Sequence, residues 1–245
     1  MKSADHNAIM TGESPAETAI DFLDGFLYRW NTWPDMIPLF ATVYGNSIPR
    51  YGMDLAPGSD GFFIQSAVLF VEGAIMGRLP MHAADLLKDY ENGSAYTEKM
   101  KYLKKLAKYR HIAVGGNYLV YGKLLRPLRF INMEPDLSVS YNEPKQRYNS
   151  GVVKTKALQA GAFEAKDGSI GIFIVNVTDT PISFQCDLPA DKYPLLSIKN
   201  IEVMRIDESG GKHFEGKFKA GHIRIKREIA GHDVMFLSIR APKDH

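Results

Sequence analysis

The segment Gly168-Ser169-Ile170-Gly171-Ile172-Phe173-Ile174-Val175-Asn176-Val177 decides the fold of the second half of this chain. Residues 170–177 are apolar on both faces, as expected of a short strand at the centre of a sheet that is covered on two sides. The preceding Lys166-Asp167-Gly168 is typical of a hairpin loop. The sequence therefore predicts a central antiparallel strand that begins directly after a tight turn.

Strands with one exposed face are predicted on the carboxyl side of this segment. Apolar and polar residues alternate along 182–188, and the same alternation recurs along 223–229. A period of two indicates half-buried antiparallel strands. Ser209-Gly210-Gly211 marks a further hairpin loop. Cys186 falls on the inward series, so it is expected to be a packed thiol.

Before residue 127, short apolar runs alternate with helix signals. Residues 8–10 predict a strand. In Ser14-Pro15-Ala16-Glu17, the serine and glutamate form a capping box and the proline suits the first helical position. A helix is therefore predicted from this motif to about residue 30. Residues 38–44 are an apolar run bounded by proline and glycine, which predicts a buried parallel strand.

Two longer helices are predicted next. Residues 62–77 are apolar nearly all round, as in a helix that is packed on both sides. Within it, Glu72 must be hydrogen-bonded, neutral or directed to a wet cavity. Residues 95–113 carry an apolar stripe among lysines, which predicts a helix with a solvated face. Gly115-Gly116 follows this helix and is expected to end it.

These patterns predict a multidomain α+β chain. Residues 1–126 read as a partial (β/α) barrel segment, and residues 127–245 read as an all-β antiparallel sandwich. A complete barrel typically needs about 250 residues, so about half a barrel is expected. An open sheet edge and apolar helix faces would favour self-association.

Composition bounds the class of protein. The chain has 245 residues, of which 45% are apolar and 24% charged, and this fits a soluble globular protein. A formal charge of +2 favours neither nucleic acid nor an anionic membrane surface as a partner. Cys186 is the only cysteine, so an intramolecular disulfide and a cysteine-based zinc site are excluded. The histidines show no metal-ligand spacing, and no metal or cofactor is expected.

Localisation stays open. The first ten residues lack the apolar core of a secretory signal, and no later run reaches the roughly 18 uncharged apolar residues of a membrane span. Residues 62–76 contain Gln65, Ser66 and Glu72, so they are expected to form a buried helix of a soluble protein. An export signal could nevertheless precede Met1 if the chain is a piece of a longer protein.

Glu13 is the candidate catalytic residue. It ends a strand-to-helix loop one position before the predicted helix, and (β/α) barrels place catalytic groups at the carboxyl ends of their strands. The helix amino terminus favours the ionised carboxylate, which suits a nucleophile or a base. The alternative is a loop carboxylate that only interacts with the helix dipole.

Four residues are candidates for binding a sugar. Trp30, Trp33 and Tyr44 have flat aromatic faces, and core packing is the alternative for each of them. Asp54 lies in a loop that could reach the same face as Glu13, with a loop or capping role as its alternative. A glycosidase needs two carboxyl groups, about 5–5.5 Å apart for retention and about 6.5–9.5 Å apart for inversion. Glu13 alone is therefore not sufficient for this chemistry.

Three motifs follow one another in the first half of the chain: TGESPAE at 11–17, LFATVYG at 39–45 and EGAIMGRL at 72–79. In this order they resemble the last strands and helices of a glycoside-hydrolase-like (β/α)8 barrel family with an appended β-domain. Residues 118–127 resemble the exit from such a barrel, and residues 168–177 resemble a strand of its carboxy-terminal β-sandwich. The resemblance implies a glycoside-hydrolase-related protein that acts on glycosidic bonds, has carbohydrate as its partner and carries Glu13 on the catalytic face.

Two alternatives stand beside the enzyme. The chain is either a catalytic relative or a non-catalytic protein whose sandwich binds carbohydrate or supports another domain. It is also short for a barrel enzyme, so it is expected to be a carboxy-terminal fragment of a carbohydrate-active enzyme, and its activity in isolation stays open.

Overall fold

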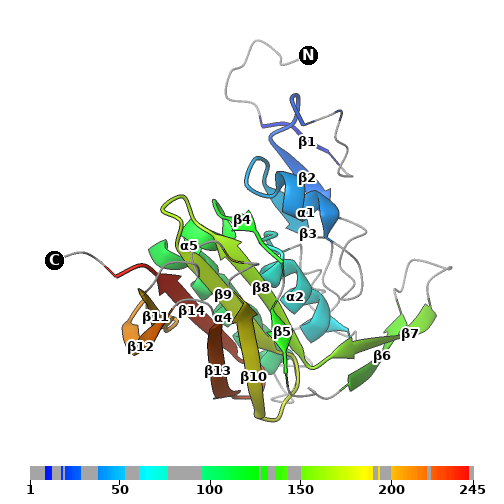
Figure 1. Cartoon of the computed structure of the whole chain (residues 1–245). Helices are drawn as coiled ribbons and strands as arrows, with labels where there is room; N and C mark the ends of the chain where they lie inside the picture. The colour runs from blue at the N-terminus through cyan, green and yellow to red at the C-terminus, as the bar shows by residue number, and fades with distance from the viewer. Residues whose placement is uncertain are drawn as a thin grey trace.

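The computed structural model describes residues 9–12, 18, 20–28, 38–52, 61–76, 95–126, 128–131, 136–142, 150–189, 193, 200–219 and 222–242. Most of the described chain is an antiparallel β-sandwich with helices on one outer face (Figure 1). A small parallel sheet near the amino terminus lies at the far side of the helices (Figure 1).

The larger sheet of the sandwich has six strands in the order β12-β11-β14-β9-β8-β4. All its neighbouring strands are antiparallel. The strands are β4 (Lys123–Leu124), β8 (Leu158–Glu164), β9 (Ile170–Asn176), β11 (Asn200–Ile206), β12 (Lys212–Lys219) and β14 (Val234–Arg240). The predicted strand at 170–177 is therefore confirmed as an interior strand, β9.

The facing sheet has three strands in the order β13-β10-β5. They are β5 (Arg129–Phe130), β10 (Ile182–Pro189) and β13 (His222–Ile229). A separate two-stranded sheet pairs β6 (Asp136–Asn142) with β7 (Ser150–Lys156). The antiparallel sandwich predicted for the second half is confirmed. The two segments with alternating apolar and polar residues, 182–188 and 223–229, form β10 and β13.

Two apolar cores explain why β9 is apolar on both faces. Ile170, Ile172 and Ile174 belong to the core between the two sheets. Phe173 and Val175 point the other way, into a core shared with the helices. All seven residues of β9 are buried, and the polar Asn176 at its end donates to the carbonyls of Thr180 and Ala230. Cys186 lies fully buried between the sheets, as its place in the alternation predicted.

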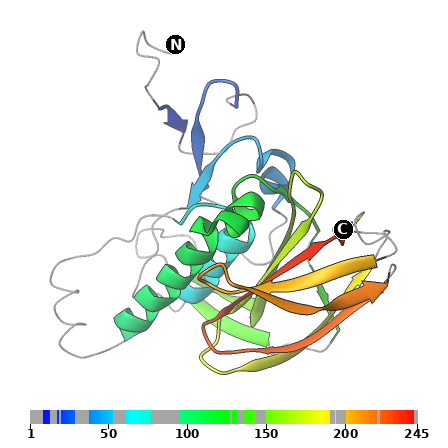
Figure 2. The same cartoon turned by 90° about the vertical axis from the view of Figure 1, so that its left-hand side faces the viewer.

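In the described part of the chain, three helices cover the outer face of the six-stranded sheet (Figure 2). They are α2 (Phe62–Val71), α4 (Ala95–His111) and α5 (Ala113–Leu119). Phe70 of α2 meets Phe173 of β9 edge to face at 5.4 Å between ring centroids, and Phe173 stacks on Phe236 of β14 at 4.3 Å. These contacts anchor the helical layer to the centre of the sheet.

The amino-terminal sheet consists of β1 (Thr11–Gly12), β2 (Gly25–Tyr28) and β3 (Arg50–Gly52), and all its pairs are parallel. The helix α1 (Leu39–Tyr44) lies between β2 and β3 in the chain. Arg50 of β3 donates from Nη2 to the Glu72 carbonyl at 2.8 Å, at the carboxyl end of α2. Arg110 of α4 donates to the carbonyls of Gly73 and Ala74 at 3.0 Å. Two cations therefore complement the end of α2, where helix carbonyls lack intrahelical partners.

Several predictions for the first half are wrong. The helix expected up to residue 30 is replaced at Gly25–Tyr28 by strand β2, because parallel partners on both sides satisfy its backbone. The buried strand expected at 38–44 is the helix α1, in which Ala41 is buried while Leu39 is 67% exposed. A short apolar run does not distinguish helix from strand by its periodicity.

Gly115-Gly116 does not end a helix, because both residues lie inside α5. A Cβ at Gly115 would lie 1.8 Å from the Tyr109 carbonyl oxygen, so glycine lets α5 begin directly against the last turn of α4. The described residues of the first half do not show the predicted partial barrel: they form three parallel strands, α1 and the helical layer. The strand β4, at the end of this half, pairs with β8 of the sandwich.

Candidate functional site

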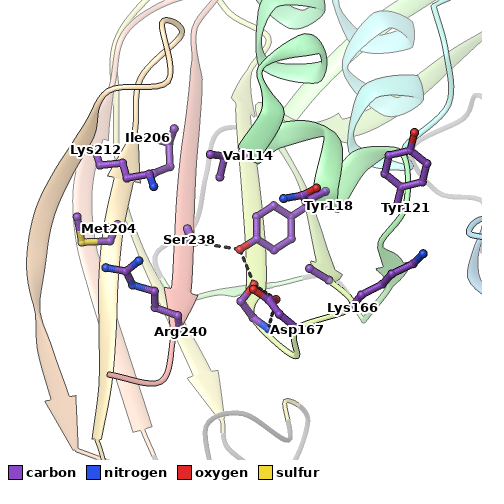
Figure 3. A pocket seen from close by; sticks show the side chains of 13 residues that line it. Val114, Tyr118, Tyr121, Lys166, Asp167, Met204, Ile206, Lys212, Ser238 and Arg240 are labelled. Atoms are coloured by element: carbon purple, nitrogen blue, oxygen red, sulfur yellow. Dashed lines mark hydrogen bonds between the residues drawn. The ribbon is translucent and has the colours of Figure 1, made fainter. Parts of the chain in front are cut away.

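A cavity of about 470 Å³ opens between α5 and the outer face of the six-stranded sheet (Figure 3). We call it the Tyr118 cavity. Its lining comes from α5 and the turn after it, from the β8–β9 hairpin, and from β11, β12 and β14. Ligand pockets in proteins commonly have volumes of about 300–1,000 Å³, so its size suits a small ligand.

The floor of the cavity is a chain of hydroxyl groups. The Tyr118 hydroxyl lies 2.7 Å from Ser169 Oγ and 3.0 Å from Ser238 Oγ. Ser169 Oγ donates to Asp167 Oδ1 at 2.5 Å. A hydroxyl has one hydrogen to donate, so Tyr118 donates to Ser169 and accepts from Ser238. Tyr118, Ser169 and Ser238 are all buried. Their hydrogen bonds form one chain in which each hydroxyl donates to the next group, from Ser238 of β14 through Tyr118 of α5 to the β8–β9 hairpin (Figure 3).

Asp167 ends this chain as an ionised carboxylate. The hydrogen bond from the Ser169 side chain holds the pKa of Asp167 below its usual value, and the Ser169 backbone N–H adds a second bond at 3.0 Å. Both donors stabilise the charged form. The exposed Asp167 therefore contributes a fixed negative charge and acceptor oxygens at the mouth of the cavity.

Local sequence explains why these groups meet. Gly168 has φ +78°, which closes the hairpin and brings Asp167 back onto Ser169. Across the sheet, a Cβ at Gly171 would lie 2.4 Å from Tyr118 Cγ, so only glycine admits the tyrosine ring at this position. The ring also meets Phe236 edge to face at 5.6 Å. Packing against Gly171 of β9 and Phe236 of β14 therefore positions the Tyr118 ring, in addition to the hydrogen bonds of its hydroxyl.

The rim carries three cations, Lys166, Lys212 and Arg240. Within the described ranges, neither lysine forms an ion pair, while Arg240 Nη2 lies 3.5 Å from Glu202 Oε2. The Nε atom of Arg240 is buried and donates to no acceptor among the described residues. A buried donor left without an acceptor costs about 1–3 kcal/mol. The Arg240 side chain as a whole is 34% exposed, so part of it is open to a ligand in the cavity.

The wall on the sheet side is partly apolar. Val114 of α5 faces Met204 and Ile206 of β11 across the cavity (Figure 3). The site thus combines an apolar wall, a hydroxyl floor, one carboxylate and a cationic rim. Such a combination suits a ligand that has hydroxyl groups as well as apolar C–H surface.

Most of the sequence-predicted site residues cannot be placed in this geometry. Glu13, Trp30, Trp33 and Asp54 lie outside the described residues. Tyr44 is described: it is the last residue of α1, and its ring lies 5.1 Å from that of Phe40. It does not line the Tyr118 cavity.

Glu72 is the C-cap of α2 and is 7% exposed. Its carbonyl, as noted, receives the Arg50 guanidinium. The sequence did not indicate the Tyr118 cavity as a site, because Ser169 and Ser238 lie 51 and 120 positions from Tyr118. The one local signal was the Asp167-Gly168 turn, which predicted a hairpin and no site.

The described residues contain no group of three or more His, Cys, Asp or Glu side chains arranged to hold a metal ion. Among the helices in the part of the chain that is described, none is both long and apolar enough to cross a membrane.

Comparison with known proteins gives structural neighbours only. No family model matches the chain, and no curated protein matches it. Among solved structures it is similar to a GH27 β-L-arabinopyranosidase from Geobacillus stearothermophilus, with 8% identity, a TM-score of 0.44, and coverage of 97% of this chain and 51% of that chain. It is also similar to α-galactosidase I from Mortierella vinacea, with 10% identity, a TM-score of 0.40, and coverage of 91% and 54%.

A third neighbour, described as a glycoside hydrolase, has 15% identity, a TM-score of 0.44, and coverage of 98% of this chain and 59% of that chain. The chain thus spans about half the length of these solved proteins. These three neighbours are glycoside hydrolases. Identities of 8% to 15% with TM-scores below 0.5 assign neither an activity nor a substrate to this chain.

Proposed function

We propose that this chain is part of a glycoside-hydrolase-related protein and that its described part binds carbohydrate in the Tyr118 cavity. The observation that carries the proposal is the chain of hydroxyls from Ser238 through Tyr118 and Ser169 to Asp167, set against an apolar wall. Sugar rings present hydroxyls at their edges and C–H groups on their faces. The cavity offers a partner to both kinds of surface.

Binding fits this cavity better than hydrolysis does. Asp167 is the one carboxylic acid among the lining residues of the described chain. Hydrolysis of a glycosidic bond needs a pair of carboxyl groups, one of which acts as a general acid. The Ser169 hydrogen bond keeps the pKa of Asp167 low, so Asp167 is a poor proton donor at neutral pH. Its role here is to accept hydrogen bonds.

We propose that hydrolysis takes place at a different site, which includes Glu13 and belongs to a longer protein of which this chain is a part. Glu13 is the candidate nucleophile or base, with a second carboxylate contributed by strands that precede this chain, and residues 1–126 and 127–245 are proposed as the barrel-derived and sandwich domains. This part of the proposal rests on the resemblance of residues 11–17, 39–45 and 72–79 to a barrel family. Trp30, Trp33, Tyr44 and Asp54 are proposed as its sugar contacts.

Binding is tested by titrating the full chain with a panel of neutral and acidic oligosaccharides and recording NMR chemical-shift changes. Ser238→Ala removes one hydroxyl of the floor and should weaken binding by about twofold to tenfold, as the loss of a hydrogen bond worth about 0.5–1.5 kcal/mol does. Ser183→Ala is the matched control, because Ser183 lies on β10 of the other sheet and is bonded to Glu228. Absence of binding by every oligosaccharide would refute the proposal.

Catalysis is tested separately with aryl glycosides. If the protein hydrolyses them, Glu13→Gln should abolish turnover while leaving sugar binding at the Tyr118 cavity intact. Turnover that survives this substitution would exclude Glu13 from the mechanism. No turnover by the wild type, together with sugar binding, would favour the non-catalytic carbohydrate-binding alternative.

Self-association is a further part of the proposal. Leu39 and Val43 of α1 are 67% and 51% exposed, and exposed apolar side chains on one helix favour contact with another surface. Sedimentation of the wild type and of Leu39→Ser with Val43→Ser tests this. A monomeric wild type would exclude it.

A further inference from the structure

We infer that the ligand of the Tyr118 cavity is a carboxylate-bearing sugar, a uronic acid unit of an acidic glycan, whose carboxylate lies between Arg240 and Lys212. This inference rests on the carbohydrate binding proposed above and names the class of sugar. It follows from the two cations on the sheet side of the cavity and from the spacing of Ser238 and Arg240 along β14.

Arg240 provides the first anchor. It lies on β14 and its guanidinium is directed along the sheet side of the cavity, below Met204 (Figure 3). Its Nε is buried without an acceptor among the described residues, and its bond to Glu202 is long at 3.5 Å. A guanidinium matches a carboxylate with two parallel N–H bonds. The Arg240 side chain is 34% exposed and lines the cavity, so a ligand carboxylate can approach its guanidinium from the cavity side.

Lys212 provides the second anchor. It opens β12, directly opposite Ile206 of β11, and its side chain projects into the same side of the cavity (Figure 3). It is exposed, and its Nζ forms no ion pair with any described residue. Since β12 and β14 flank β11, Lys212 and Arg240 stand on either side of Met204 and Ile206. The two cations therefore bracket the apolar wall.

The spacing of Ser238 and Arg240 along β14 lets one sugar unit contact both the hydroxyl floor and the guanidinium. Ser238 and Arg240 are two positions apart on β14 and both line the cavity. Residues two apart on one face of a strand are separated by roughly 7 Å. That separation is comparable with the span of a sugar ring, so one unit can reach Arg240 with its carboxylate while a ring hydroxyl meets Ser238 or Tyr118. A small inorganic anion would reach only one of these groups.

Charge favours an acidic sugar over a neutral one. The lining has three cations and one carboxylate, Asp167. A concave site with this excess of positive charge attracts anions. A neutral sugar would occupy the hydroxyl floor and bring no negative charge to the three cations of the rim. Lys166, on the opposite side of the rim, extends toward Tyr121 and adds to the field (Figure 3).

The experiment compares uronic acid trisaccharides, built from galacturonate or glucuronate, with their neutral galactose and glucose counterparts. Isothermal titration of the full chain should give at least tenfold tighter binding of an acidic trisaccharide, and the preference should shrink as salt is raised. Arg240→Lys keeps the charge but loses the two-bond geometry, and Lys212→Met removes one charge. Each should weaken acidic binding about tenfold and weaken neutral binding by a smaller factor, so that the preference for the acidic trisaccharide falls.

Matched controls separate local from general effects. Lys226→Met removes one charge from β13 of the other sheet and should leave acidic binding unchanged. Thermal unfolding of each variant checks that it is folded, and Arg240→Lys keeps a cation beside Glu202 so that the fold is retained. Sulfate and phosphate are titrated alone as a further arm.

The outcomes are distinct. Equal binding of neutral and acidic trisaccharides overturns the uronate inference and leaves the proposed carbohydrate binding standing. Sulfate or phosphate binding as tightly as the uronate also overturns it, since the site would then recognise a small anion. Failure of every sugar to bind overturns the proposed function itself, and the inference falls with it.

Discussion

The Tyr118 hydroxyl lies 2.7 Å from Ser169 Oγ and thereby joins helix α5 to the β8–β9 hairpin, 51 positions further along the chain. The same hydroxyl reaches Ser238 of β14 at 3.0 Å. One side chain therefore links the helical layer to the β8–β9 hairpin and to strand β14 of the six-stranded sheet. It is both a structural tie and the floor of the candidate site, so its variants report on stability and on binding.

Tyr118→Phe should destabilise the fold by about 1–2 kcal/mol. The substitution keeps the ring on Gly171 and Phe236, but it removes two hydrogen bonds and leaves the buried Ser238 hydroxyl without its acceptor. The free energy of unfolding in urea measures the loss. Tyr121→Phe is the matched control, since Tyr121 is 62% exposed, and its effect should stay within about 0.5 kcal/mol.

Gly171→Ala should destabilise the fold by about 1–3 kcal/mol. The added Cβ would meet Tyr118 Cγ at 2.4 Å, so the ring and the end of α5 must move away from β9. Gly116→Ala serves as the control, because its nearest contact would be an ordinary 3.6 Å and alanine favours a helix by up to about 1 kcal/mol. If Gly171→Ala left the free energy of unfolding unchanged, Tyr118 would not be held against the sheet.

His232 should make stability depend on pH below neutrality. Its ring stacks on Phe63 at 3.8 Å and 6°, and burial holds the pKa of His232 below its usual value near 6.5. The folded state thus favours the neutral ring. Its contribution is fully present above the unfolded pKa and is lost as pH falls through the folded pKa.

The measurement is the free energy of unfolding of wild type and His232→Asn between pH 8 and pH 5. Asparagine tolerates the positive φ of 47° at this position and does not titrate in this range. The wild type should lose more stability over this interval than the variant does. Identical pH profiles would show that His232 does not titrate differently in the folded and unfolded states.

Cys186 should be inert toward thiol reagents in the folded protein. It is fully buried between the sheets, and burial, helped by the charge of Asp187, raises the pKa of its thiol to about 12. The thiolate is the reactive form, so native protein should label only as fast as it unfolds. Labelling with a chromogenic disulfide in buffer and in denaturant checks this. Rapid labelling of native protein would place Cys186 at an accessible surface.

The local sequence pattern predicts the secondary structure of the second half of the chain better than that of the first half. The period of two along β10 and β13 and the turn at Gly168 predicted strands, hairpin and inward face, because each depends on neighbours in the sequence. In the first half, residues 39–44 satisfy a strand pattern equally well, and they form a helix in which one side contacts the core. Tertiary packing decided between two conformations that the local pattern allowed.

The sequence by itself determined an antiparallel sandwich whose central strand is apolar on both faces, and it placed Cys186 inside. Tertiary structure alone decided what covers the second face of β9, namely the helices α2, α4 and α5. It alone assembled the Tyr118 cavity, because Tyr118, Ser169, Ser238, Lys212 and Arg240 come from elements far apart in the chain. A side-chain pattern reports which face of a strand is buried, but the partner that buries it is set by how distant elements pack.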